Sequence, residues 1–200
     1  MINYKDNESL HSYFLRILQL NGEISNSLAL KGIVGINGRI KLLPVANNAI
    51  KRQFEVDISC LYPIIKEHMI SQKLAMIYFD ELVEYVLSGI NVSDKKFLTP
   101  VVDSFLYCPI CFQEQINRDG FAWFKREWLL SKYCIEHKLL LFHVYGKKTS
   151  CCSASFNIYE GVLSALSGKC FTCRENYWGS DCIQLLSYGD KTSIRKKFNL

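Results

Sequence analysis

Two short motifs carry the clearest metal-ligating side chains of this chain. They are Cys108-Pro-Ile-Cys111 and Cys134-Ile-Glu-His137, so each supplies two ligands separated by two residues. Pairs of this kind sit on tight turns that aim both side chains at one point. Two pairs together supply the four sulfur and nitrogen ligands of a tetrahedral structural zinc ion. A shell of four protein ligands leaves no position for water, so the spacing predicts a structural site rather than a catalytic one.

A second group of cysteines follows, at Cys151, Cys152, Cys170 and Cys173. Cys170 and Cys173 have the same spacing as the first pair, whereas Cys151 and Cys152 are adjacent. Neighbouring side chains of a strand point to opposite faces, so both can reach one metal ion only across a distorted turn. We predict a second zinc site with all four cysteines as the leading ligand set. Two alternatives stay open: one of the adjacent cysteines completed by His143 or Cys182, or a site that no longer binds metal.

Residues 112–133 separate the two pairs of the first site and are predicted to form its small module. This spacer is longer than that of a ββα finger, which carries its histidines on a helix placed for DNA contact. We expect a short strand, a turn at Asp119-Gly120 and a second extended run. That order is typical of a zinc-ribbon-like or treble-clef-like module.

The same spacer mixes aromatic and basic residues. Trp123 and Trp128 lie an odd number of residues apart, so in an extended run they point to opposite sides. At least one is expected to be buried against the zinc module, with Lys125 or Arg126 facing solvent.

The first hundred residues are predicted to be helical. Apolar residues from Leu10 to Leu18 recur at helical spacing after Asp6 or Asn7, either of which can cap the helix, and Gly22 ends it. Further helices are expected over residues 24–30, from Asn47 or Asn48 to residue 58, and over residues 71–86, followed by a linker at 93–100. We therefore predict a helical domain over residues 1–98, a first zinc module over 99–148 and a second module with a tail over 149–200.

These helices fit either a helix-turn-helix-like domain or a bundle that binds only protein. Arg39, Lys41, Lys51 and Arg52 could contact phosphates, or they could lie on an ordinary solvated face.

Composition narrows the class of protein. The chain has 200 residues, 49% of them apolar, and no uninterrupted apolar stretch of about 20 residues that could span a membrane. Its first residues lack an apolar signal core, so we expect a cytoplasmic protein. The nine cysteines then suit metal binding better than disulfides. The formal charge of +5 is weak support for nucleic-acid binding, because two occupied zinc sites would add about three negative charges.

Two parts of the sequence resemble the TniQ family of TnsD-like transposition target-selection proteins. Residues 107–142 contain a Cys-Pro-x-Cys, an aromatic and polar stretch, a Cys-x-x-His and then the apolar run Leu139-Leu-Leu-Phe142. The opening segment, Glu8-Ser-Leu-His-Ser-Tyr-Phe-Leu-Arg16, resembles the first signature of the family. The resemblance implies a helix-turn-helix-like N-terminal domain followed by zinc-ribbon-like zinc finger modules. The expected fold class is therefore an α-helical domain with small zinc-binding modules.

The resemblance also implies a function. Members link a targeting module, either a CRISPR effector with guide RNA or a DNA site, to a TnsC-like AAA+ ATPase that regulates transposition on DNA. We expect this chain to be a non-catalytic adaptor of that kind, with no membrane contact. Exposed aromatic and basic side chains are its expected contacts with partners or DNA. The basic residues and the histidine singled out are His11, Arg16, Arg118, Lys125, Arg126 and Lys132.

Two other classes of function are weighed against the adaptor. A stand-alone zinc-dependent DNA-binding regulator would bind a short duplex by itself, with sequence preference and a steep salt dependence. A redox enzyme would need Cys170 and Cys173 free of metal, and no βαβ pattern surrounds them. The chain carries no His-Glu-x-x-His motif, P-loop or nucleophile elbow.

Overall fold

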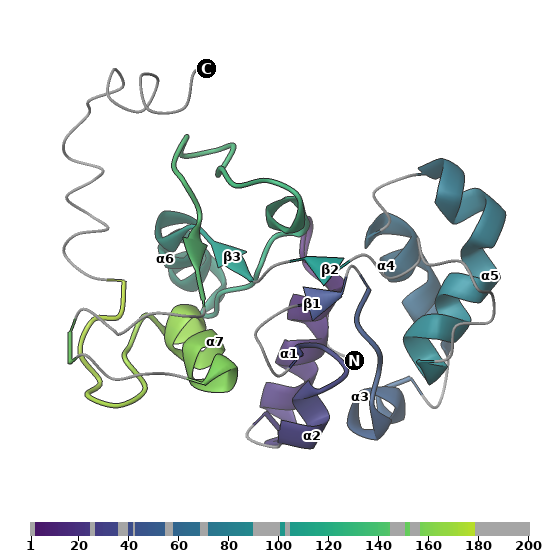
Figure 1. The fold of residues 1–200 in the computed structure, drawn as a ribbon, viewed down its shortest axis with the longest axis horizontal. Coiled ribbons are helices and arrows are strands. Elements are labelled where there is room, and N and C mark those ends of the chain that lie inside the picture. The colour runs from purple at the N-terminus through teal and green to yellow at the C-terminus, as the bar shows by residue number, and fades with distance from the viewer. Residues whose placement is uncertain are drawn as a thin grey trace.

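The structure is a computed structural model, and it is mostly helical with two small antiparallel sheets (Figure 1). It describes residues 3–24, 27–35, 40–41, 43–54, 58–68, 72–89, 101–102, 105–144, 151–152 and 157–178.

Five α-helices and one short 3₁₀ helix are described before residue 90. They are α1 (Leu10–Leu20), α2 (Ser27–Leu30), α3 (Asn48–Arg52), η1 (Ile58–Cys60), α4 (Leu61–His68) and α5 (Gln72–Ser88). The predicted first helix and the long helix over 71–86 are confirmed. The cap of α1 is Ser9 rather than Asp6 or Asn7, because its side chain accepts from the Ser12 amide. Asn47 caps α3, as expected.

The second half holds the remaining elements. They are β2 (Val101–Val102), β3 (Leu106–Tyr107), α6 (Pro109–Asp119), η3 (Arg126–Leu129), β4 (Phe142–His143) and α7 (Ile158–Ser167). β2 pairs with β1 (Ile40–Lys41) from the first half, and β3 pairs with β4. The β3–β4 pair brings the chain before Cys108 next to the chain that follows His137.

The prediction of a strand after Cys111 is wrong, because α6 occupies that stretch. The residues at the two ends of α6 explain where the helix begins and ends. Pro109 stands at the first helical position, where its missing N–H costs nothing, and Gly120 ends the helix with a left-handed φ of 81°. The predicted turn at Asp119-Gly120 is therefore present, but it follows a helix.

One continuous core joins the first helix to the second half of the chain. The Ser9 amide donates to the Phe124 carbonyl at 2.9 Å, and the Phe124 amide donates to the Ser12 hydroxyl at 3.0 Å. Figure 1 shows α1 between the α4–α5 pair and the half that carries α6 and α7. The domain limits at residues 98 and 148 stay predictions, and the linker over 93–100 lies outside the described residues.

Within the described part of the chain, no helix has both the length and the apolar character needed to cross a membrane.

Candidate metal centres

The structure brings Cys108, Cys111, Cys134 and His137 together, and we call this group the first cluster. The Nδ1 atom of His137 lies 3.5 Å from the sulfur of Cys108, 3.3 Å from that of Cys111 and 3.5 Å from that of Cys134. The sulfurs of Cys111 and Cys134 are also 3.5 Å apart. A tetrahedral zinc ion with its usual bond lengths would separate such ligand atoms by about 3.5–3.8 Å. The four ligand atoms thus fit the edges of one tetrahedron.

Two local structures position these ligands. Cys108 is the N-cap residue of α6 and Cys111 lies in its first turn. Cys134 begins a tight turn in which the Lys138 amide returns to its carbonyl at 2.9 Å, with Lys138 at a φ of 57°. A helix N-terminus favours negative charge, so thiolates there are stabilised by the nearby amides.

Hydrogen bonds between the thiols of the first cluster, together with burial, shift their pKa values in opposite directions. A hydrogen bond from the Cys111 thiol, helped by the amides of Cys111 and Ile110, lowers the pKa of Cys108 to about 5. Donating that bond raises the pKa of Cys111. Burial likewise raises the pKa of Cys134. One negative charge therefore forms readily and the next ones do not, unless a cation enters and replaces the remaining protons.

Charged groups surround the first cluster. His137 directs Nδ1 at the sulfurs, while its Nε2 lies 3.2 Å from a carboxylate oxygen of Glu114. This is the arrangement by which a carboxylate orients a histidine ligand. Glu136 approaches the Cys111 sulfur at 3.1 Å and also accepts from the ammonium of Lys125. Burial alone would lower the pKa of Lys125, but the bond to Glu136 and the attraction of Cys111 raise it. The raised pKa favours the charged form of Lys125, which pairs with Glu136 next to the Cys111 sulfur.

The structure also brings Cys151, Cys152, Cys170 and Cys173 together, and we call them the second cluster. The sulfurs of Cys152 and Cys170 are 3.6 Å apart, those of Cys151 and Cys173 are 3.5 Å apart, and those of Cys151 and Cys152 are 4.0 Å apart. Cys151 and Cys152 lie in a turn, which lets adjacent side chains point the same way. Cys170 is buried, whereas Cys151 and Cys152 are exposed. Four sulfurs at these distances again suit a tetrahedral metal ion.

The alternative ligands of the second cluster are placed differently. His143 is exposed on β4 and lies outside the group of ligand atoms that meets there, within the described residues. Cys182 lies outside the described residues.

The predicted contact residues divide into exposed and buried ones. Arg118 and Lys132 are exposed, and Arg126 is half-buried. Lys125 was a candidate for facing solvent, and this is wrong, because it is buried against Glu136. The burial of at least one tryptophan is confirmed, since Trp123 and Trp128 are both in the core.

The expectation that His11 and Arg16 lie exposed is also wrong. His11 is fully buried, and its ring packs edge-on against Phe105 at 5.8 Å between centroids. Arg16 lies over Phe121 at 4.7 Å and donates from Nε and Nη2 to the two carboxylate oxygens of Glu8, at 2.7 and 2.6 Å. Burial raises the pKa of Glu8, and the bonds from Arg16 oppose that shift. The opening segment therefore holds a buried ion pair between Glu8 and Arg16.

Among the candidate phosphate contacts, Arg52 is exposed and pairs with Glu23 at 2.8 Å, and Lys51 is half-buried. Arg39 and the side chain of Lys41 lie outside what the structure describes. The residues that sequence reasoning missed are Glu8, Glu114 and Glu136. Glu114 follows Cys111 by three residues, a spacing that places both on one face of a helix, so it would have been found once α6 was recognised.

Comparison with the sequence profiles of known families assigns residues 1–141 to TniQ. The match includes both the opening segment around the Glu8–Arg16 pair and all four residues of the first cluster. The chain belongs to the TniQ family. Comparison with curated proteins gave no match, and comparison with solved structures gave none. Membership of TniQ associates the chain with transposition, and its two clusters could each hold a metal ion.

Proposed function

We propose that this TniQ-family chain is a non-catalytic target-selection adaptor, which links a targeting module to a TnsC-like AAA+ ATPase on DNA. The targeting module is either a CRISPR effector with guide RNA or a DNA site. The observation that carries the proposal is the TniQ match over residues 1–141, which spans the opening helix and the first cluster.

We further propose that zinc is the metal of both clusters and that its role is structural. Cys108, Cys111, Cys134 and His137 would hold one ion, and the second cluster would hold the other. Zinc would cross-link separate parts of the chain at each cluster. Four protein ligands would fill its preferred shell and leave no position for water or substrate. Three thiolates and one Zn²⁺ would leave about one negative charge at the first cluster, beside the Lys125–Glu136 ion pair.

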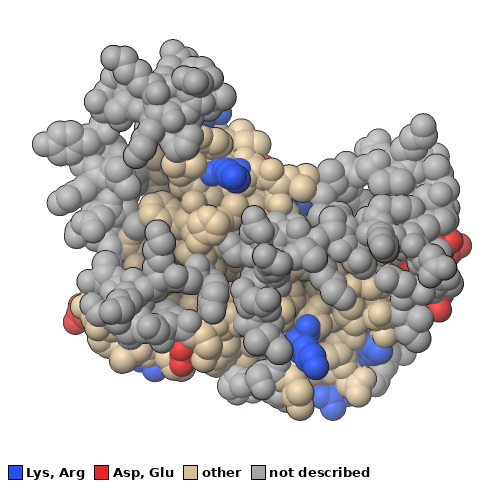
Figure 2. All heavy atoms as spheres, in the orientation of Figure 1, with Lys and Arg blue, Asp and Glu red and all other residues tan. Residues whose placement is uncertain are grey.

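The surface supports a role within an assembly better than independent DNA reading. On the face shown in Figure 2, the described lysines and arginines are scattered and form no continuous basic patch. Arg52 and Arg118 are further occupied by Glu23 and Asp119. Sequence-specific binding by one domain needs several phosphate contacts in register with base contacts.

The test is reconstitution of targeted integration. The gene for this chain is deleted from an element that also encodes the ATPase, the transposase and the targeting module, and is then restored in trans. The adaptor proposal predicts that integration loses its target preference on deletion and regains it on restoration. The same purified chain is then titrated alone with short duplexes. Selection of one duplex at nanomolar affinity, on the order typical of specific DNA binders, would replace the adaptor with the stand-alone regulator.

A further inference from the structure

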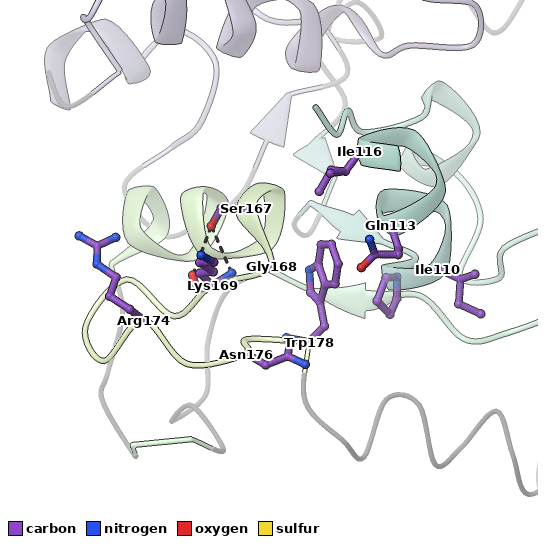
Figure 3. A pocket seen from close by; sticks show the side chains of 10 residues that line it. Ile110, Gln113, Ile116, Ser167, Gly168, Lys169, Arg174, Asn176 and Trp178 are labelled. Carbon is purple, nitrogen blue, oxygen red and sulfur yellow. Dashed lines mark hydrogen bonds between the residues drawn. The ribbon is translucent and has the colours of Figure 1, made fainter. Parts of the chain in front are cut away.

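A groove runs between α6 and the segment that follows α7, and we call it the α6–α7 groove. It consists of two adjoining hollows with volumes of about 530 and 390 Å³. Ile116, Ser167, Lys169 and Arg174 line both of them, so the two hollows adjoin. Figure 3 shows the α6 side chains on one side, Trp178 next to them, and Lys169 and Arg174 on the side away from α6.

The groove combines an apolar lining with positive charge. Ile110 and Ile116 come from α6, and Leu163 and Leu166 come from α7. The ring of Trp178 completes the lining beside α6. Among the described residues that line the groove, two are basic and none is acidic.

The two basic residues flank the second cluster. Lys169 directly precedes Cys170, and Arg174 directly follows Cys173. Both side chains are exposed, and neither forms an ion pair with any residue of the described part of the chain. The guanidinium of Arg174 lies over the ring of Phe171 at 5.5 Å. Both side chains are therefore available to a ligand in the groove, beside the net charge of about −2 that four thiolates and one Zn²⁺ would leave at the second cluster.

The backbone that carries these charges is held in place. The Arg174 amide donates to the Cys170 carbonyl at 3.0 Å, and the Tyr177 amide donates to the Gly168 carbonyl at 2.8 Å. The indole N–H of Trp178 donates to the carbonyl of Ala165 at 2.9 Å. A preformed site spends less free energy on ordering when it binds.

We propose that the α6–α7 groove binds a protein segment of a partner that presents apolar side chains together with carboxylates. The apolar lining and the two cations complement such a segment. A nucleic acid fits less well, because two cations engage few phosphates and Trp178 is too buried to stack on a base. The chain's own residues 179–200 carry four basic and two acidic side chains, so their net charge does not complement Lys169 and Arg174. This inference deepens the proposed adaptor role, since an adaptor needs a surface for each partner.

The test uses the zinc-loaded chain of 200 residues and a fluorescent 12-residue peptide of alternating leucine and glutamate. Matched peptides carry glutamine or lysine in place of glutamate. Binding is followed by fluorescence anisotropy. We expect the glutamate peptide to bind more tightly than either control. The double variant Lys169→Glu/Arg174→Glu should weaken its binding by about tenfold or more, because the two rim charges then repel the glutamates of the peptide.

A matched double variant, Lys31→Glu/Lys66→Glu, makes the same charge change at two exposed lysines elsewhere. It should leave binding of the glutamate peptide nearly unchanged. The lysine peptide should gain affinity for Lys169→Glu/Arg174→Glu, which a misfolded variant could not produce. Equal effects of the two double variants, no preference for the glutamate peptide, or tighter binding of a duplex through Lys169 and Arg174 would each overturn the proposal. The peptide assay contains no ATPase, so it tests the groove separately from the adaptor role. If the peptide fails to bind while the chain still recruits the ATPase, only the groove proposal is wrong.

Discussion

Replacing Arg16 with methionine should destabilise the protein far more than its position on a helix suggests. The Arg16 side chain keeps only 8% of its exposure, and its guanidinium makes two short bonds to Glu8, whose side chain has no exposure. It also donates to the Asn3 carbonyl at 2.8 Å and covers the ring of Phe121. Methionine roughly keeps the volume but leaves the buried Glu8 carboxylate without its cation, with the Lys5 amide still donating to it at 3.1 Å. Breaking a buried pair in this way costs about 3–5 kcal/mol of unfolding free energy.

The measurement is urea unfolding of the full chain at fixed zinc concentration. Arg52→Met is the matched control, because Arg52 pairs with Glu23 while its side chain keeps 59% of its exposure. An exposed pair contributes about 0–1 kcal/mol, so this variant should unfold close to the parent. The double variant Glu8→Gln/Arg16→Met removes both charges and should recover much of the loss. If Arg16→Met costs no more than Arg52→Met, the Glu8–Arg16 pair does not stabilise the opening segment.

Four further substitutions test the clusters and their surroundings. Cys108→Ser should remove about one zinc equivalent by elemental analysis and destabilise the second half, because metal binding supplies folding free energy; unchanged metal content would contradict the first site. Cys170→Ser should remove the other equivalent, and unchanged content would exclude it as a ligand. Glu114→Ala should weaken zinc binding about tenfold in chelator competition, because the histidine ligand loses its orienting carboxylate; equal affinity would make that contact incidental. Gly168→Ala should cost about 1–2 kcal/mol, since φ is 68° there and a Cβ would meet the Trp178 ring at 3.0 Å; a stability equal to the parent would show that the turn relaxes freely.

The two groups of candidate metal-binding side chains could be predicted because their signal is local. Two residues between Cys108 and Cys111 are enough to define a turn, whatever the rest of the chain does. α5 was also predictable, since a long apolar stripe identifies a helix without knowledge of its partners, and Leu82, Tyr85 and Val86 are indeed buried.

α6 was missed for a physical reason. Its sequence after Phe112 is polar except for Ile116, and its buried face is short, so its hydrophobic periodicity is weak. The end signals were nonetheless present, with Pro109 at the first position and Gly120 just past the last. The spacing of Cys108 and Cys111 predicts a tight turn, but the same spacing also fits the first turn of a helix.

The burial of His11 and Arg16 depends on partners that sequence periodicity does not identify. His11 packs on Phe105, and Arg16 needs both Glu8 and Phe121. Arginine is mostly exposed in proteins unless it is paired, so an isolated reading of the helix places it at the surface. Only the folded structure shows which carboxylate lies close enough to pair with Arg16 in the core.

The central claim is tested most directly by measuring the affinity of this chain for its ATPase on DNA. The purified zinc-loaded chain is titrated by biolayer interferometry against immobilised duplex, with and without the neighbouring AAA+ ATPase and nucleotide. The account predicts weak, sequence-independent binding to the duplex alone and much tighter binding once the ATPase filament is present. Equal binding in both conditions, or tight binding to one particular duplex without the ATPase, would contradict it.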